Sequence, residues 1–320
     1  MYVCHTSPPS ERWLRRVNTN SINMRKPDSP TLRKKTEPYL YLLPTLLLMC
    51  VLLIIPIIMV IRYSFYDNVI INKNPVFVGL ENFKLIFENS TFVVAVKNTA
   101  VFVGGSIVFH MILGLAFAVV LNTKYLHRRT KAVSRVLLAL PWMFTASVIA
   151  ILWKMMMNPN GVINYLLSVA NLGGSHIEWL ASRDFALFSI TLINIWAGYP
   201  FYMVSLLAGL QGIPNDLHEA AAIDGANVSQ RFFRVTLPQL KPIIISLVML
   251  DFVWTIQQFA LIWMTTGGGP INATEMMSTF IYKLGFSKYE YAQASASAVI
   301  LLVVCTIVAI FYVRHQRGQE

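Results

Sequence analysis

Six long apolar stretches dominate this sequence and leave little of the chain for anything else. They cover roughly residues 39–62, 93–121, 136–157, 185–211, 242–266 and 292–313. A helix that crosses the hydrocarbon core of a bilayer needs about 20 mostly apolar residues, and each stretch is long enough. Charged residues make up 13% of the chain, whereas soluble domains carry roughly a quarter. The pattern predicts an all-α membrane protein with six transmembrane helices and no large soluble domain.

The positive charge of the chain marks alternate connections between these stretches. The net charge is +11, which in a soluble protein would suggest nucleic-acid binding. Most of the Lys and Arg residues, however, lie before the first stretch, between the second and third, between the fourth and fifth, and after the sixth. Cytoplasmic loops of membrane proteins carry such an excess. The sequence therefore predicts a multi-pass membrane protein with both termini in the cytoplasm, and no nucleic-acid partner.

The two ends of the chain are predicted to be tails. Residues 1–38 are rich in Pro, Ser, Arg and Lys and lack hydrophobic periodicity, which predicts disorder. The first apolar stretch is too long for a signal peptide and no small-residue cleavage site follows it, so we expect it to remain as a span. Met24 is a second plausible start, and the sequence leaves open whether residues 1–23 are translated. Residues 39–313 then form the transmembrane domain, and residues 314–320 form a cytoplasmic tail.

Motifs of catalytic and metal-binding sites do not occur in the sequence. It has no GxxxxGK[ST] loop, HExxH helix, CxxC pair or GxSxG turn. The cysteines Cys4, Cys50 and Cys305 have no metal-ligand spacing. We therefore expect a transport subunit that is not an enzyme and binds no metal or cofactor. If ATP drives it, the nucleotide and its Mg²⁺ belong to a partner chain.

The most informative segment lies between the fourth and fifth apolar stretches, at residues 213–241. Asp216 and Glu219 have the spacing of a helix capping box, and three alanines with the highest helix propensity follow. Gly225 is predicted to stop that helix. A second helix is expected from about Asn227 to Val235, ended by Pro238. The product would be a knob with small side chains, suited either to a groove on another protein or to resting on the membrane surface.

The spacing of this segment resembles the EAA loop of ABC importer permeases. Glu219-Ala220-Ala221 is followed after three residues by Gly225, and after nine more by Val235-x-Leu237-Pro238. Val235 stands where that loop usually has Ile. The resemblance implies that this loop, as the energy-coupling element, docks on an ATPase through Glu219, Ala220, Ala221, Asp224, Gly225, Leu237 and Pro238.

Four further strings are similar to the sugar-permease branch of this family, and to its maltose-type members most of all. They are GLENF at 79–83, WAGYPFYM at 196–203, LQGIPNDLHEAA at 210–221 and TTGGGPINATE at 265–275. The resemblance covers roughly residues 38–315 and implies the type I ABC importer permease fold. It also implies a location in the bacterial cytoplasmic (inner) membrane and three partners: a second homologous permease, an ABC ATPase dimer and an extracytoplasmic solute-binding protein.

The same resemblance indicates where cargo would meet the chain. Eight residues match sugar-contacting positions of the maltose-type permeases: Asn194, Ala197, Gly198, Phe201, Asp251, Trp254, Thr255 and Gln258. Independently, the spacing of Asp251, Trp254 and Gln258 places them on one helical face, and a buried acid in a span usually faces a cavity or a partner. Trp254 and Thr255 could instead face lipid or a neighbouring helix. His110, in the middle of the second stretch, could pack through hydrogen bonds or line a cavity.

The residue types at these positions favour a neutral mono- or oligosaccharide as cargo. Amides and carboxylates bind sugar hydroxyls, and aromatic rings stack on the apolar faces of sugars. The fourth and fifth stretches carry Lys and Arg only at their flanks, whereas a phosphorylated solute would require a cation. Relative to the maltose-type pattern, Trp replaces Phe, Thr and Gln replace Asn, and Asp replaces Ser, which argues against maltose itself. Glycerol phosphate or another polar solute remains the alternative cargo, and a cation-driven secondary transporter is the alternative class.

Overall fold

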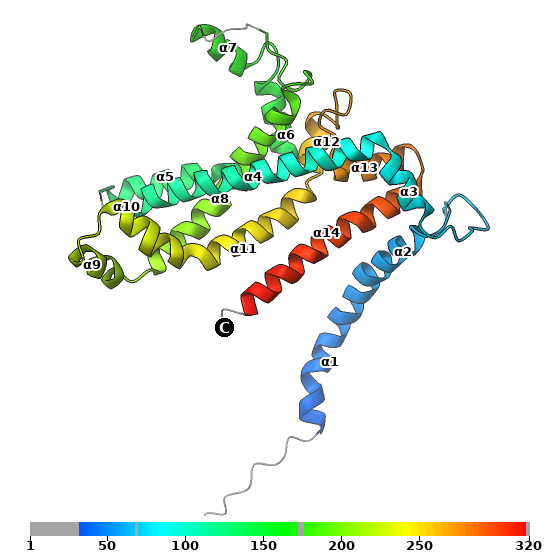
Figure 1. Cartoon of the computed structure of the whole chain (residues 1–320), viewed down its shortest axis with the longest axis horizontal. Helices are drawn as coiled ribbons and strands as arrows, with labels where there is room; N and C mark the ends of the chain where they lie inside the picture. The colour runs from blue at the N-terminus through cyan, green and yellow to red at the C-terminus, as the bar shows by residue number, and fades with distance from the viewer. Residues whose placement is uncertain (1–31, 68–69, 124, 172–175, 318–320) are drawn as a thin grey trace, which may run out of the picture. The chain divides into compact units, whose positions relative to one another are not determined.

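The computed structural model describes residues 32–67, 70–123, 125–171 and 176–317, and these residues are almost entirely helical (Figure 1). Within them, strand-like pairing is limited to one isolated bridge between Tyr66 and Phe77. Five helical segments are long and apolar enough to cross a membrane, and one bent helix pair makes a sixth if it counts as one span. The predicted all-α membrane fold is therefore confirmed.

The first span consists of α1 (Leu32–Met49), a five-residue π-helix (Cys50–Ile54) and α2 (Ile55–Tyr63). Helix α1 begins inside the segment predicted to be disordered, so that prediction extended too far along the chain. Residues 1–31, which include the proposed extension and Met24, lie outside the described residues. The π-helix directly precedes the Ile55-Pro56 pair. Proline cannot donate the usual helical hydrogen bond, and a wider turn lets the helix continue past it.

The remaining spans pack around the contact between α4 (Ser90–Asn122) and α8 (Ala186–Gly212), which is the most extensive helix pairing. Helix α11 (Leu237–Ile256) packs on both, and α14 (Tyr291–Arg317) packs on α11 (Figure 1). A Cβ on Gly114 would overlap Tyr202 of α8, so this glycine permits the close approach, as small residues do in membranes. The buried residues of this contact include Ala118, Tyr202 and Leu206.

The third span differs from the continuous helix predicted for residues 136–157. It consists of α5 (Arg128–Met143) and α6 (Ala146–Met156), which meet at 98°. Phe144 and Thr145 between them have extended backbone conformations, and the Thr145 hydroxyl accepts a hydrogen bond from the Val148 amide at the start of α6. A hydroxyl cap of this kind starts a new helix. The sequence contains this signal, but the apolar residues on both sides obscured it.

The fifth span begins and ends earlier than predicted. Helix α10 (Val228–Arg231) continues through a π-helix (Phe232–Thr236) into α11, so the helix is not ended by Pro238 as expected. The Leu237 amide donates to the Phe232 carbonyl, and this wide turn accommodates the proline as it does in the first span. The span ends at Ile256, and residues predicted to extend it form the separate helix α12 (Ala260–Thr265).

Helices α9 (Asn215–Ile223) and α10 lie at the end of the bundle where α8 ends, α11 begins and α14 ends (Figure 1). Short helices gather at the opposite end: α3 (Glu81–Glu88), α7 (Val162–Val169), α12 and α13 (Met277–Tyr282). A π-helix (Lys283–Ser287) leads from α13 towards α14. The loop between α4 and α5 is at the same end as α9 (Figure 1), so the connections rich in Lys and Arg are clustered.

Candidate functional site

The 213–241 loop folds into a compact helical turn at one end of the bundle. Gly225 follows α9 with a φ of 79°, and the backbone amides of Gly225 and Ala226 donate to the carbonyls of Ala222 and Ala221 at 3.1 and 2.9 Å. This pair of hydrogen bonds is a Schellman motif, the usual helix stop at glycine. The prediction that Gly225 stops the helix is confirmed.

The predicted capping box of Asp216 and Glu219 is wrong. Pro214 occupies the cap position of α9, no side chain caps the helix, and Asp216 lies in its first turn. The chain starts this helix with a proline that favours an extended approach, so Asp216 lies too far along the helix to cap it. A capping box does form at the start of α10, where Asn227 and Gln230 exchange side chain–backbone hydrogen bonds of 2.8 and 2.9 Å.

Large apolar side chains on this loop are exposed. Ile223 is 86% exposed and Val228 is 75% exposed, and Phe233 also projects outward. Glu219, Ala220, Asp224, Gly225 and Pro238 are exposed, while Ala221 and Leu237 are half-buried. We call the surface around Ile223, Gly225 and Val228 the coupling face. Apolar residues grouped on an exposed surface indicate a contact with another protein or a membrane.

A cavity of about 250 Å³ lies beside the bend between α5 and α6, and we call it the bend cavity. Seven of the eight residues predicted to contact cargo line it. From α8 come Asn194, Ala197 and Gly198; from α11 come Asp251, Trp254 and Thr255; Gln258 follows α11. His110, for which the sequence left a cavity role open, also lines it, and the sequence prediction missed five further lining residues: Pro141, Trp142, Phe144, Ala146 and Ile149. Most of these belong to the third span, whose bend was not foreseen.

Three aromatic rings form one side of this site. Phe201, the eighth predicted residue, does not line the bend cavity itself, but its ring packs 5.3 Å from Trp254 and 5.8 Å from Trp142, measured between centroids. Trp254 is 56% exposed. Trp254 therefore lines the cavity and also contacts a neighbouring helix, α8, through Phe201. We call Trp142, Phe201 and Trp254 the aromatic wall.

A buried hydrogen-bond network joins residues of α4, α8 and α11 at this cavity. The Asp251 carboxylate is close to His110 Nδ1 at 2.8 Å, and it accepts hydrogen bonds from the Tyr202 hydroxyl at 3.0 Å and the Thr255 hydroxyl at 2.7 Å. His110 Nε2 lies 3.0 Å from the Asn194 carbonyl oxygen. The Asn194 side chain donates to Ser106 at 2.9 Å. His110 therefore both packs through hydrogen bonds and lines the cavity, so both sequence interpretations hold together.

Gly198 has a direct steric reason for being glycine. A Cβ on Gly198 would overlap the imidazole ring of His110. The absence of a side chain at this position on α8 therefore makes room for the ring that reaches Asp251. By contrast, the Gln258 side chain makes no hydrogen bond to any other described residue, so its amide is available to the cavity.

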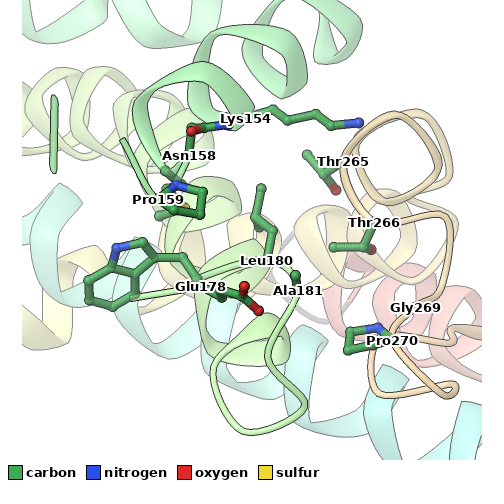
Figure 2. A pocket seen from close by; sticks show the side chains of 12 residues that line it. Lys154, Asn158, Pro159, Glu178, Leu180, Ala181, Thr265, Thr266, Gly269 and Pro270 are labelled. Atoms are coloured by element: carbon green, nitrogen blue, oxygen red, sulfur yellow. The ribbon is translucent and has the colours of Figure 1, made fainter. Parts of the chain in front are cut away.

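A second cavity, of about 390 Å³, lies at the end of the bundle opposite α9, and we call it the loop cavity (Figure 2). Lys154 extends from α6 towards Thr265, and Glu178 lies on the other side of the opening. The 265–275 loop that forms one edge is held by Asn98, whose amide donates to the carbonyls of Asn272, Ala273 and Glu275, each at 3.1 Å. These hydrogen bonds fix the position of the loop at the edge of the cavity.

Metal chemistry has no support in the part of the chain that the structure describes. No group of three His, Cys, Asp or Glu side chains there is placed to hold a metal ion. The polar and aromatic side chains that line the bend cavity are suited to binding a solute through hydrogen bonds and ring contacts.

The chain matches the family model of the binding-protein-dependent transport system inner membrane component over residues 110–319. Two relatives among reviewed proteins span nearly the same length. A trehalose/maltose transport system permease protein of Thermococcus litoralis is 35% identical over 283 residues, covering 87% of this chain and 93% of the relative. An sn-glycerol-3-phosphate transport system permease protein of Pectobacterium atrosepticum is 30% identical over 277 residues, covering 86% and 92%.

Solved structures of a bacterial importer of the acidic polysaccharide alginate share the fold. One chain superposes with a TM-score of 0.78 at 25% identity and covers 90% of this chain and 98% of its own length. A second structure, in complex with an alginate pentasaccharide-bound periplasmic protein, gives a TM-score of 0.75 at 25% identity, with coverage of 88% and 95%. This chain belongs to the family of binding-protein-dependent transport system inner membrane components, the permease subunits of ABC transporters.

Proposed function

We propose that this permease imports a neutral mono- or oligosaccharide through the bend cavity, driven by ATP hydrolysis on a separate ATPase dimer. The observation that supports this most is the convergence of seven predicted cargo residues, from two spans, on one cavity. Aromatic rings and amide groups together suit sugars, because a sugar has both apolar ring faces and hydroxyls. Trp254 and Gln258 would supply the stacking surface and the hydrogen-bonding group.

The charge of the cavity favours a neutral cargo over glycerol phosphate. Among the described residues that line the bend cavity, none is Lys or Arg. Phosphate recognition normally relies on such charged donors. His110 is the one ring there that can carry a positive charge, and it is already paired with Asp251. The glycerol-phosphate relative keeps a phosphorylated solute as the alternative, and a second permease could supply the missing cation.

The cognate solute-binding protein offers the cleanest test of cargo class. It would be purified without ligand and heated with maltose, trehalose, glycerol 3-phosphate or an alginate oligosaccharide, since a bound ligand stabilises the folded state. We expect a neutral sugar to raise the melting temperature most. A rise with glycerol 3-phosphate alone, or with the acidic oligosaccharide alone, would contradict the neutral-sugar proposal and leave the permease assignment intact.

The coupling face is the part of the chain through which we propose that ATP hydrolysis acts. The apolar side chains of Ile223 and Val228 are exposed in the described chain. A docked ATPase subunit would bury them. The two hydrogen bonds of the Schellman motif at Gly225 hold the end of α9 in one defined conformation. Glu219, exposed on α9, would pair with a basic residue of the ATPase. Changing the population of two conformations from about 1:99 to 99:1 needs ~5.5 kcal/mol of differential binding, which docked partners could supply.

Partners and orientation follow from the same arrangement. The basic connections and the coupling face share one end of the bundle (Figure 1), which we assign to the cytoplasm by the positive-inside rule. The Lys and Arg residues that precede the first span and follow the sixth support a cytoplasmic location of both termini by the same rule. The loop cavity would open on the opposite side, where a solute-binding protein delivers cargo. A second homologous permease would complete the translocation pathway.

A further inference from the structure

We infer that His110 and Asp251 form a neutral, hydrogen-bonded pair that positions the walls of the bend cavity, and that Asp251 acts through this pair instead of binding cargo. The inference rests on the proposed function, because it concerns the same cavity. It reassigns Asp251 from cargo contact to positioning residue and adds His110 in the same role. The geometry of one ring and one carboxylate carries it.

The hydrogen-bond partners of the His110 ring fix how many protons the pair holds. Nε2 faces the Asn194 backbone carbonyl at 3.0 Å, and a carbonyl oxygen can only accept, so Nε2 must carry a proton. Nδ1 faces the Asp251 carboxyl group at 2.8 Å. One proton lies between them, on either the nitrogen or the oxygen. In both cases the pair as a whole carries no net charge.

The Asp251 carboxyl group is occupied by groups of the same chain. Thr255 donates to Oδ1, while His110 and Tyr202 both contact Oδ2. The residue is only 7% exposed. A carboxylate has about four acceptor positions, and three are used here. One acceptor position, on Oδ1, remains, and the burial of the side chain restricts the access of a sugar hydroxyl to it.

The pair joins the three helices that carry the cavity walls. His110 belongs to α4, Tyr202 to α8 and Asp251 to α11. Trp254 lies one helical turn beyond Asp251 on α11, and Gly198 leaves the space that the His110 ring fills. Fixing Asp251 therefore fixes the rotation of α11, and with it the direction in which Trp254 projects into the cavity.

Asparagine can keep the contacts to His110, Tyr202 and Thr255 without a charge, with the Tyr202 hydroxyl becoming an acceptor. In the Asp251→Asn variant, with His110 neutral and protonated at Nε2, the new amide nitrogen would donate to Nδ1 and to the Tyr202 oxygen, and the amide carbonyl would accept from Thr255. Leucine has a similar volume but would leave His110, Tyr202 and Thr255 without their partner. The D251N and D251L variants thus separate hydrogen bonding from charge, and they separate positioning from direct cargo binding.

The test uses the full transporter, purified in nanodiscs and reconstituted in proteoliposomes with its binding protein. The variants are Asp251→Asn, Asp251→Leu, His110→Leu and the double variant His110→Leu/Asp251→Leu. Thermal unfolding without cargo is measured first. Uptake of radiolabelled trehalose is then measured for KM and maximal rate, or uptake of the tested sugar that stabilises the binding protein most if this is not trehalose.

We expect Asp251→Leu and His110→Leu to lower the unfolding temperature by several degrees and to raise KM. The unfolding temperature of the double variant should fall by less than the sum of the two single decreases, because the two residues act as one unit. Asp251→Asn should restore the unfolding temperature and keep KM within about threefold of the original value. A carboxylate that binds cargo directly would instead lose about 10- to 100-fold in KM on conversion to Asn.

Two results would overturn the inference. In the first, Asp251→Asn raises KM as much as Asp251→Leu does while the unfolding temperature stays unchanged. In the second, the effects of the two leucine variants simply add. A failure of the proposed function looks different: no sugar is taken up by the original transporter, yet the unfolding measurements still report whether the pair exists.

Discussion

Replacing Gly225 by Val tests whether the coupling face depends on the turn that ends α9. The φ of 79° at Gly225 is a conformation in which a residue with a Cβ is disfavoured by roughly 1–2 kcal/mol, and a β-branched residue more so. If the turn relaxes to avoid this strain, the two hydrogen bonds to Ala221 and Ala222 are lost, each contributing about 0.5–1.5 kcal/mol. Either the strain or the loss of the two hydrogen bonds destabilises the native conformation of the turn by about 1–3 kcal/mol.

This cost should remain local to the loop. A Cβ on Gly225 would meet nothing within 4 Å, so the substitution creates no clash that could disturb the bundle. We expect normal membrane insertion and normal pairing with the second permease. Docking of the ATPase subunit should weaken by roughly 5- to 150-fold, which is what about 1–3 kcal/mol means for an affinity. The binding protein's affinity for sugar should not change.

Gly212 provides the matched control. It is the last residue of α8, a Cβ there would also meet nothing within 4 Å, and its φ lies outside the left-handed region. Gly212→Val should therefore keep the ATPase bound. The assay is co-purification of the ATPase with each variant, followed by ATP hydrolysis in proteoliposomes with loaded binding protein. If Gly225→Val retains the normal amount of ATPase and normal stimulated hydrolysis, this loop is not the energy-coupling element.

Three further outcomes follow from the structure. Gly198→Ala should displace the His110 ring and destabilise the permease by about 1–3 kcal/mol through overpacking, seen as a lower unfolding temperature; an unchanged temperature would mean that the ring is free to move. Trp254→Leu should raise KM for sugar uptake about tenfold while leaving the unfolding temperature near normal, and an unchanged KM would remove the aromatic wall from the cargo site. Deletion of residues 1–23 should leave insertion and uptake near normal, because Arg25 to Lys35 still supply the positive charge that sets orientation; loss of insertion would show that the segment is needed.

Much of the architecture follows from the sequence because bilayer thickness imposes a length on every span. Apolar length identified the five continuous spans and the bent α5–α6 pair, and the glycine stop of α9 followed from backbone sterics alone. Interruptions inside spans were missed. The α5–α6 bend depends on a single Thr145 cap, and helix continuation through Pro238 depends on a π-helix, and neither changes the apolar pattern that marks a span.

The cavity residues show the same division. Periodicity grouped Asp251, Trp254 and Gln258 on one face of a helix, and the resemblance added the residues of α8. Nothing in the sequence indicated that Asp251 reaches His110, which is 141 residues away. Contacts between spans depend on how helices rotate against one another, and no local pattern encodes that rotation. Trp142 was missed for a related reason, since it faces the cavity only because α5 ends just after it.

Stimulated ATP hydrolysis tests the central claim most directly. The permease would be reconstituted with its partner permease, its ATPase and its solute-binding protein in proteoliposomes, and hydrolysis would be measured with the binding protein empty and loaded with the sugar that stabilises it most. The account predicts that loading raises hydrolysis, that sugar accumulates inside the vesicles only when ATP is supplied on the ATPase side, and that Gly225→Val reduces both effects. Sugar uptake that follows an imposed ion gradient and proceeds without ATP would contradict it.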